Sequence, residues 1–515
     1  MGKYILTLDI GTTNIKAFLF NKEGEIFAEA KRRPAYILDE TGKVEQDPAE
    51  IWEFSRQVMD EIVTDNNINA ENIEAIGIST QRASFLFWDK RTGKTYSNII
   101  GWQDVRSASY AEEITNSFSM RMVRFIAKIG FFFTRKTKML TGSMLKFNTD
   151  HASVRTGFYL KNNPEINKEM QDPSSNIIWG TIDSWILWNL TGGEVHATDY
   201  SNISSTGLLD PFTLKWNSIV LKAFKIPKHI LPEIKETGDD FGSTTLFGGG
   251  IIKITAVQAD QQASLFGQCC FSFGEMKITN GTGSFIDINT GNEPKASKRK
   301  LYPLIAWRLN GETTYLLEGV SHNTGNIIDW IQKELSLYQD PSETESMALS
   351  VNSTNGVYFL PTFSSGISYP YWDHTAKGNI FGISLNTKKE HIVRAVLEGI
   401  SYRIKDIVEG IIADINIPVE KIKVDGGVSN NKFFLQFLCD ILGIEVEHSL
   451  NPETTALGVT FMAGLVTGFW NSKEELISIR KIENIYKPQI NEQERKIKAS
   501  YWNDIIKRSL NYQNY

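Results

Sequence analysis

The order of apolar and polar positions along the chain predicts strands and helices in alternation. Residues 4–20 are typical of two β-strands around a Gly-Thr-Thr turn. Residues 48–67 carry apolar side chains at helical spacing, and Asp47 before them is a suitable N-cap. Residues 73–79 then return to a strand pattern. This alternation predicts a layered α/β fold.

A related pattern returns in the second half. Residues 275–288 again form strand, Gly/Thr turn and strand, and residues 421–427 form a strand that ends in Asp-Gly-Gly. A glycine run interrupts the pattern within residues 245–256. We therefore predict two α/β domains, residues 1–253 and 254–515, with a cleft between them.

One segment of the first domain has an unusual charge pattern. Residues 114–149 contain no acidic residue, and phenylalanines stand at 125 and 131–133. The basic residues are Arg121, Arg124, Lys128, Arg135, Lys136, Lys138 and Lys146. We favour a surface helix or loop with a solvated basic face and an apolar side packed on the core. The alternative is that segment 121–146 contacts a membrane surface or another subunit.

Composition excludes several classes of protein. The chain of 515 residues is too long for one hydrophobic core, and its net charge of −6 gives no reason to expect nucleic-acid binding. Three cysteines without CxxC spacing and seven scattered histidines argue against a disulfide framework and a zinc site. The start has no secretory pattern, and no apolar run is long enough to span a bilayer. We expect a cytoplasmic protein without a transmembrane segment.

The small-residue turns are candidate phosphate sites. Converging backbone N–H groups bind anions, glycine allows close approach, and threonine adds a hydroxyl donor. Each turn alone is more typical of a hairpin, but the three in order, at 9–13, 280–283 and 425–427, favour phosphate binding. The P-loop pattern is absent from the sequence, and so is the combined set of HRD and DFG motifs that is typical of protein kinases.

Two aspartates stand beside strand ends. Asp9 directly precedes the first turn, where its carboxylate could face a Mg²⁺ ion on nucleotide phosphates. Asp260 lies between a β-rich run and a helix, where it could accept a proton from an attacking alcohol. Capping the turn or the helix is the structural alternative for each.

Longer segments carry a family resemblance. LDIGTTNIKAFLF at 8–20, ADQQASLFGQCC at 259–270 and VDGGVSNN at 424–431, with a long signature over 378–398, resemble the FGGY family of carbohydrate kinases. Within that family the chain is most similar to the glycerol kinase branch, in particular the divergent form found in animals. The resemblance implies two actin-like domains, each on a ribonuclease-H-like core, that close around ATP, Mg²⁺ and a small polyol.

The resemblance also implies roles for single residues. Asp260 is expected to be the general base, and Asp9 and Asp260 are expected near the metal. Arg82, Trp102, Gln261 and Phe285 match the polyol pocket. The residues that match the ATP site are Thr12, Thr13, Asn14, Lys16, Gly281, Thr282, Gly325, Gly426, Gly427 and Asn431.

Departures from the family pattern bear on the substrate. Ala83 stands where a glutamate normally accepts hydrogen bonds from glycerol, and a tyrosine expected near Asp150 is missing. Asp150 could supply the lost acceptor. We expect phosphorylation of a primary hydroxyl, with glycerol as the first candidate and a larger polyol, a ketose or dihydroxyacetone as alternatives. A weakly active ATP-binding sensor or scaffold is a third possibility, and a homo-oligomer is expected.

Overall fold

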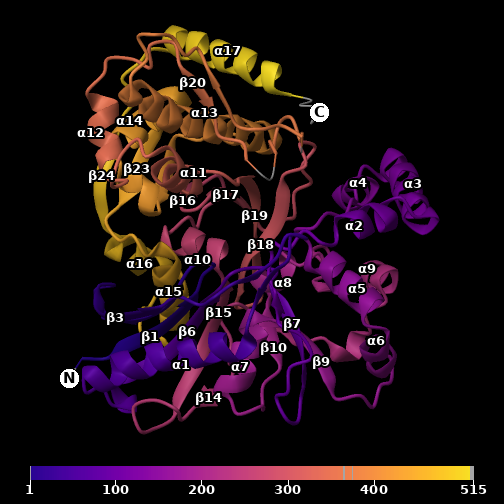
Figure 1. Ribbon diagram of the computed structural model, residues 1–515. Coiled ribbons are helices and arrows are strands. Elements are labelled where there is room, and N and C mark those ends of the chain that lie inside the picture. Colours follow the sequence, from indigo (N-terminus) through magenta and orange to yellow (C-terminus); the bar gives the residue numbers. More distant parts are fainter. Residues whose placement is uncertain (1, 364–365, 374, 511–515) are drawn as a thin grey trace.

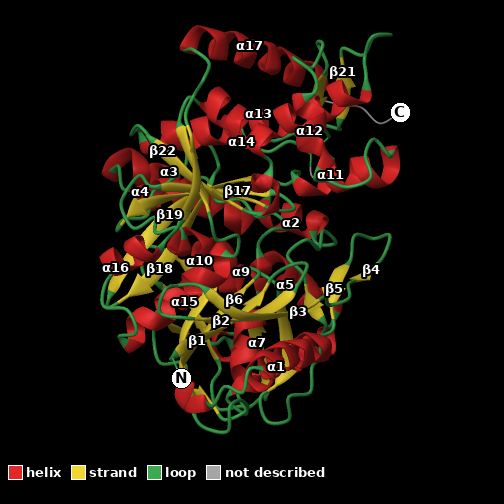
Figure 2. Ribbon diagram, turned by 90° about the vertical axis from the view of Figure 1, so that its left-hand side faces the viewer, coloured by secondary structure: helices red, strands yellow, loops and turns green. Residues whose placement is uncertain are grey.

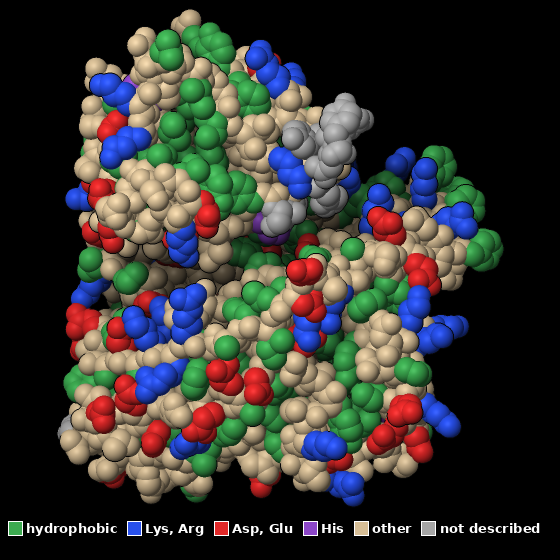
Figure 3. Space-filling model, viewed as in Figure 1, with side chains coloured by type: hydrophobic (Ala, Val, Ile, Leu, Met, Phe, Trp, Pro, Cys, Tyr) green, Lys and Arg blue, Asp and Glu red, His purple; other side chains and the backbone are tan. Residues whose placement is uncertain are grey.

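Two large β-sheets, each covered by helices, form the two lobes of the molecule. The computed structural model describes residues 2–363, 366–373 and 375–510, so the outermost residues of both predicted domains lie outside it. Figure 1 shows the lobe built from the first half of the chain below the lobe built from the second half. The space-filling view shows the surface hollowed between the lobes (Figure 3).

The first sheet has six strands and buries both of its faces. Leu6 and Leu8 pack in a core with helix α1 (Pro48–Asp65), whereas Ile5, directly before Leu6, packs in a core on the opposite face. This division follows from the two-residue period of a strand. The strands are, in spatial order, β14 (Ser243–Thr244), β15 (Ile252–Ala259), β6 (Ile73–Thr80), β1 (Tyr4–Ile10), β2 (Ile15–Phe20) and β3 (Ile26–Arg32).

The second sheet has seven strands and carries the long helix α13 (Lys389–Ile415) on one face. Its central strands run in both directions, with β16 parallel to β22 and antiparallel to β17. The strands are, in spatial order, β18 (Tyr302–Leu309), β19 (Glu312–Ser321), β17 (Ser284–Gly291), β16 (Met276–Asn280), β22 (Lys421–Asp425), β23 (Glu445–Ser449) and β24 (Ile482–Tyr486).

Helices α10 (Asp260–Gly267) and α15 (Thr454–Thr467) join the two sheets. Figure 2 shows both helices between the sheets. Helix α10 contacts strands of both sheets, and α15 contacts the first sheet and α10. Glycines allow their close approach, because a Cβ on Gly458 would lie 1.8 Å from the carbonyl oxygen of Ala263. The chain thus returns from the second lobe to pack across the first sheet. The predicted boundary at 253/254 falls within β15.

The remaining elements surround this frame. A five-stranded sheet flanks the first lobe and contains β4 (Ile37–Leu38), β5 (Val44–Gln46), β8 (Ile99–Ile100), β7 (Phe85–Asp89) and β9 (Ile177–Thr181). Three two-stranded pairs are β10 (Ala197–Asp199) with β13 (Glu233–Lys235), β11 (Leu209–Asp210) with β12 (Lys215–Trp216), and β20 (Tyr358–Leu360) with β21 (Asn379–Phe381). The other helices are α2 (Ala108–Thr115), α3 (Phe118–Thr134), α4 (Thr137–Ser143), α5 (Ala152–Asn162), α6 (Pro164–Met170), α7 (Ile182–Leu190), α8 (Tyr200–Ser204), α9 (Ser218–Phe224), α11 (Gly325–Trp330), α12 (Glu343–Leu349), α14 (Lys432–Leu442), α16 (Lys473–Ile479) and α17 (Glu492–Ser509). Within the described residues, none of the helices has both the length and the apolar character needed to cross a membrane.

The basic segment corrects one expectation. It forms two helices, α3 and α4, but the predicted apolar contact with the core is wrong for most of α3, where only Met120 and Ala127 are buried. Phe125, Phe132 and Phe133 are exposed instead. The segment projects from the first lobe, so a single helix has too little neighbouring surface to cover its apolar side (Figure 1).

Candidate active site

The carboxyl ends of three parallel strands bring the two predicted aspartates and Arg82 to one sheet edge. Strand β6 is parallel to both β1 and β15. Asp9 lies near the end of β1, Arg82 follows β6, and Asp260 follows β15 as the first residue of α10. These residues are far apart in sequence, yet the parallel register places them together, as is typical of ligand sites in α/β sheets.

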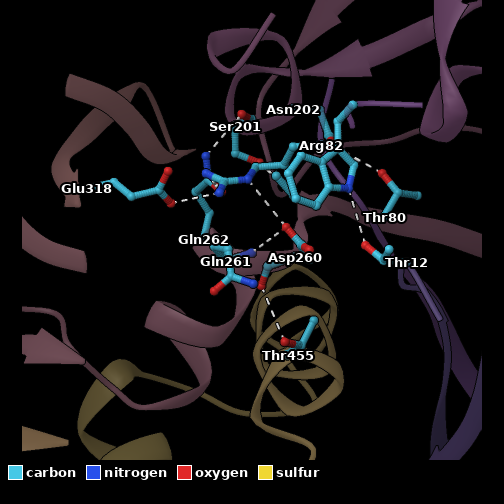
Figure 4. Close-up of polar contacts among 12 residues, drawn as sticks. Thr12, Thr80, Arg82, Ser201, Asn202, Asp260, Gln261, Gln262, Glu318 and Thr455 are labelled. Carbon is cyan, nitrogen blue, oxygen red and sulfur yellow. Dashed lines mark hydrogen bonds and ion pairs between the residues drawn. The ribbon is translucent and has the colours of Figure 1, made fainter. Parts of the chain in front are cut away.

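Asp260 and Arg82 form the centre of the site (Figure 4). Arg82 Nε lies 3.4 Å from Asp260 Oδ1, and its Nη2 lies 2.7 Å from Oε2 of Glu318 on β19. Burial raises the pKa of the Asp260 carboxyl above its ordinary value, and Arg82 opposes that rise. A carboxylate of raised basicity, held by a fixed cation, can accept a proton from an alcohol.

Arg82 is anchored from the second lobe by a polar row that the sequence reasoning missed. Tyr302, Glu318, Asp287 and Lys277 are direct cross-strand partners on β18, β19, β17 and β16. Paired residues share one face of a sheet, so these four side chains form one row. What brings these four residues together is the register of neighbouring strands, and a single sequence does not reveal which residues are paired across strands.

The charges in this buried row are linked. Lys277 Nζ lies 2.7 Å from Asp287 Oδ2, and both side chains are fully buried. Burial and the neighbouring Asp287 raise the pKa of Glu318 to about 8, against the lowering effect of Arg82. Because this pKa lies above neutral pH, the pair of Glu318 and Asp287 retains a proton there, which reduces the repulsion between the two carboxyl groups.

The predicted polyol-pocket residues are arranged around this centre. Lys277 donates to Oε1 of Gln261 at 2.7 Å, which fixes the side chain next to Asp260. The Arg82 guanidinium lies 5.6 Å from the centre of the Phe285 ring. Trp102 Nε1 donates to the hydroxyl of Thr12 at 3.3 Å and so links the expected pocket to the first phosphate turn. The structure brings all of these residues to one region.

The first predicted phosphate turn lies between β1 and β2. Thr12 and Asn14 are partly exposed there and Thr13 is exposed. Lys16, opposite Asp9 across the β1–β2 pair, is ion-paired with Glu453 at 2.5 Å. Lys16 would have to exchange this partner to bind a phosphate.

The other two turns meet at one edge of the second sheet. Gly281 and Thr282 follow β16, and the amide of Gly325 at the start of α11 donates to the carbonyl of Gly281 at 3.0 Å. Gly426 follows the parallel strand β22 with φ +89°, and a Cβ there would lie 2.5 Å from the carbonyl oxygen of Asn280. Gly427 has open space beside it. The amides of Gly281 and Gly325 are engaged within these turns, so phosphate binding at this edge stays a prediction.

Asn431 is already engaged. Its Oδ1 caps helix α14 by accepting from the amide of Phe434 at 2.9 Å, and its Nδ2 donates to Thr344 at 3.1 Å. A nucleotide role for Asn431 stays a prediction, and any such contact would compete with the cap.

Asp9 has the features of a metal-facing carboxylate. It is buried, and its Oδ1 has no hydrogen-bond partner among the described residues. Burial, with Glu453 and Asp260 nearby, raises the pKa of Asp9 to about 7, and Lys16 opposes the rise. An unpartnered carboxylate oxygen fits Mg²⁺, which prefers oxygen ligands.

Asp150 lies on the loop after α4 and is hydrogen-bonded to both lobes. Its Oδ2 accepts from the hydroxyl of Tyr302 at 3.0 Å and from Asn148 at 2.9 Å. Tyr302 neighbours Glu318 across β18 and β19. Asp150 is therefore linked to the second lobe through Tyr302, and its contact with a polyol stays a prediction.

Arg155 on α5 holds the loops around this pocket. Its buried guanidinium donates to backbone carbonyls of five residues, namely Ala83, Ile100, Gly101, Thr149 and Asp150. Ala83 itself has φ +60°, a conformation that costs a residue with a Cβ about 1 kcal/mol or more. Arg155 thus stabilises a strained turn at the position of the missing glutamate.

Comparison with known proteins identifies the family. The model of the N-terminal domain of the FGGY family of carbohydrate kinases matches residues 4–267, and that of the C-terminal domain matches residues 276–466. The chain belongs to the FGGY family of carbohydrate kinases. The expected fold of two actin-like ATPase domains is confirmed by the structural neighbours.

Several glycerol kinases resemble this FGGY kinase over its full length. It is 39% identical to glycerol kinase 5 of Bos taurus over 511 residues, which are 99% of this chain and 96% of the relative. It is 38% identical to glycerol kinase 2 of Thermotoga maritima over 99% of both chains. The crystal structure of Plasmodium falciparum glycerol kinase with ADP matches with a TM-score of 0.88 and 31% identity over 99% of each chain.

Proposed function

We propose that the protein transfers the terminal phosphoryl group of ATP to a primary hydroxyl of glycerol. The carrying observation is the Asp260–Arg82 pair at the edge where both lobes contribute side chains. Full-length similarity to glycerol kinases supports the same reaction.

Asp260 takes the proton of the attacking hydroxyl in this proposal. Arg82 holds the carboxylate in position, and Glu318 holds Arg82 from the opposite side. The pKa of Asp260, raised by burial, brings its basicity closer to that required of a general base near neutral pH. In-line transfer then depends on holding the hydroxyl and the phosphoryl group in contact.

The nucleotide lies between the turns of the two lobes in this proposal. Thr12, Thr13, Asn14 and Lys16 contact the phosphates from the first lobe. Gly281, Thr282, Gly325, Gly426 and Gly427 face the nucleotide from the second. Asp9 and Asp260 would hold Mg²⁺ indirectly or through water. When bound, Mg²⁺ neutralises phosphate charge and supports the departure of ADP.

The polyol lies between Trp102, Phe285, Arg82 and Gln261. A small acceptor needs hydrogen-bond partners at each hydroxyl, and one unpaired group in a dry site costs about 1–3 kcal/mol. Asp150, oriented by Tyr302, supplies the acceptor that Ala83 lacks. This arrangement supports glycerol in spite of the missing glutamate.

A panel of acceptors tests the proposal. ADP release from Mg·ATP is measured with glycerol, dihydroxyacetone, larger polyols and ketoses, with Asp260→Asn as the blank. We expect turnover with glycerol and a loss of about 10²- to 10⁴-fold in kcat for Asp260→Asn, with ADP affinity retained. Turnover with another acceptor alone would exclude glycerol but keep the kinase reaction. No turnover with any acceptor, despite ADP binding, would overturn the kinase proposal. Near-normal kcat in Asp260→Asn would overturn the role of Asp260.

A further inference from the structure

The outer face of helix α3 is apolar and exposed to solvent. Seven large apolar side chains on this helix are exposed: Phe118, Met122, Phe125, Ile126, Ile129, Phe132 and Phe133. Phe118 and Phe133, at the two ends of the helix, are 73% and 77% exposed to solvent. Folded proteins rarely leave so many large apolar groups together in water unless another surface covers them.

These side chains form one stripe along the helix. At about 100° per residue, the seven positions fall within roughly 120° of the helix circumference. The buried residues Met120 and Ala127 lie on the opposite side. The helix therefore attaches to the protein by one face and presents the other outward.

The charged residues of α3 and of the turn that follows it are all basic. Arg121 and Lys128 are exposed along one flank, and Arg135 and Lys136 are exposed at the C-terminal end. Within the described part of the chain, these four bases make no ion pair, whereas Lys138 pairs with Asp210 at 2.8 Å. Figure 3 shows apolar and basic side chains together on the projecting tip.

We propose that α3 is an interfacial helix that docks on an anionic lipid bilayer. Phenylalanine and isoleucine side chains enter the headgroup boundary, and the flanking lysine and arginine side chains bind lipid phosphates. Charge complementarity favours this partner. A second copy of the chain would bring the unpaired bases of two subunits together, which is unfavourable without intervening acidic groups. This docking is independent of the phosphoryl-transfer reaction.

Vesicle flotation of the full chain tests the proposal. The probes are vesicles of phosphatidylcholine with phosphatidylserine and vesicles of phosphatidylcholine alone. We expect binding to the mixed vesicles that weakens as salt is added, because salt screens the basic residues. Absence of binding to the mixed vesicles would overturn the proposal.

Two variants separate the apolar and the charged contributions. Phe125→Ser/Phe132→Ser/Phe133→Ser and Arg121→Gln/Lys128→Gln should each reduce binding by about tenfold or more. The matched controls are Ile251→Ser/Leu349→Ser, which are exposed apolar residues elsewhere, and Lys496→Gln/Lys507→Gln on α17. The controls should bind like the parent, and thermal unfolding should show that all four variants fold. Undiminished binding of the phenylalanine variant would contradict the proposal.

Sedimentation without lipid tests the alternative that a second copy of the chain covers the apolar stripe of α3. The parent and the phenylalanine variant should show the same mass over the concentration range used. If the substitutions convert an oligomer into a monomer, a second copy of the chain covers the stripe and the lipid proposal is wrong.

Discussion

At the end of β1, the buried carboxylate of Asp9 lowers the stability of the protein at neutral pH. Its pKa rises to about 7 on folding, from an ordinary value of 3.8, so folding favours the protonated form. The associated stability is complete below the ordinary pKa and is lost as the pH rises through about 7. A carboxylate that binds a cation carries such a cost when the cation is absent, and the metal role proposed for Asp9 would account for this one.

The substitution Asp9→Asn should therefore stabilise the free protein above pH 7. We expect a gain on the order of 3 kcal/mol in the free energy of unfolding, which disappears as the pH approaches the ordinary pKa of Asp. Urea unfolding across this range measures it. The same variant should lose most of its Mg²⁺-dependent activity. Equal stability of variant and parent at high pH would show that Asp9 is not strained by burial.

A variant of Tyr302 tests whether Asp150 contributes to binding of the acceptor and not to binding of ATP. Tyr302→Phe removes only the hydroxyl that donates to Asp150, so the fold should be kept. We expect the KM for glycerol to rise about tenfold, because a hydrogen bond to a carboxylate is worth about 1.5–3 kcal/mol, while the KM for ATP stays constant. Tyr315→Phe, which removes a hydroxyl bonded to the carbonyl of Pro211, is the matched control. An unchanged KM for glycerol would remove Tyr302 and Asp150 from the pocket.

At the scale of elements, local sequence predicted much of the frame. The helix expected over 48–67 begins at Pro48 behind its Asp47 cap, and the predicted strands and turns around 4–20, 275–288 and 421–427 are confirmed. These elements are determined by neighbouring residues and by the burial of one face. Both leave a pattern of apolar positions and capping residues that can be recognised in a single sequence.

The parts that could not be predicted depend on contacts between distant elements. The polar row of Tyr302, Glu318, Asp287 and Lys277 arises from strand register across four strands. The exposed side of α3 follows from its projection beyond neighbouring helices, which its apolar periodicity alone does not reveal. The assignment of single residues to ATP and polyol came from the family resemblance and stays a prediction.

Helix α5 fixes the pocket loops through one side chain. Burial lowers the pKa of Arg155 to about 10, yet the guanidinium remains charged at neutral pH. Arg155→Met would leave its carbonyl partners without donors, and we expect a loss of at least about 3 kcal/mol in the free energy of unfolding. Arg155→Lys should recover only part of it, because an ammonium cannot reach the same set of carbonyls. Chemical denaturation measures both, and a loss below 1 kcal/mol for Arg155→Met would contradict this role.

At the scale of the whole molecule, the proposed ligands contact both lobes. The first lobe provides Arg82 and the turn at Thr12, and the second provides Phe285 and the turns at Gly281 and Gly426. A ligand that touches both lobes stabilises the arrangement in which they are closest. Nucleotide and polyol should therefore favour the same closed state, even without direct contact between them.

This common preference predicts reciprocal coupling between the two ligands. ADP should lower the Kd for glycerol, and glycerol should lower the Kd for ADP by the same factor, typically about 5- to 150-fold. Calorimetric titration of each ligand with and without the other measures both factors. Asp260→Asn should retain the coupling, because that substitution removes the base without separating the lobes. Unequal factors would violate linkage and reveal incomplete saturation, whereas two factors equal to one would show that the ligands bind without a shared closure of the lobes.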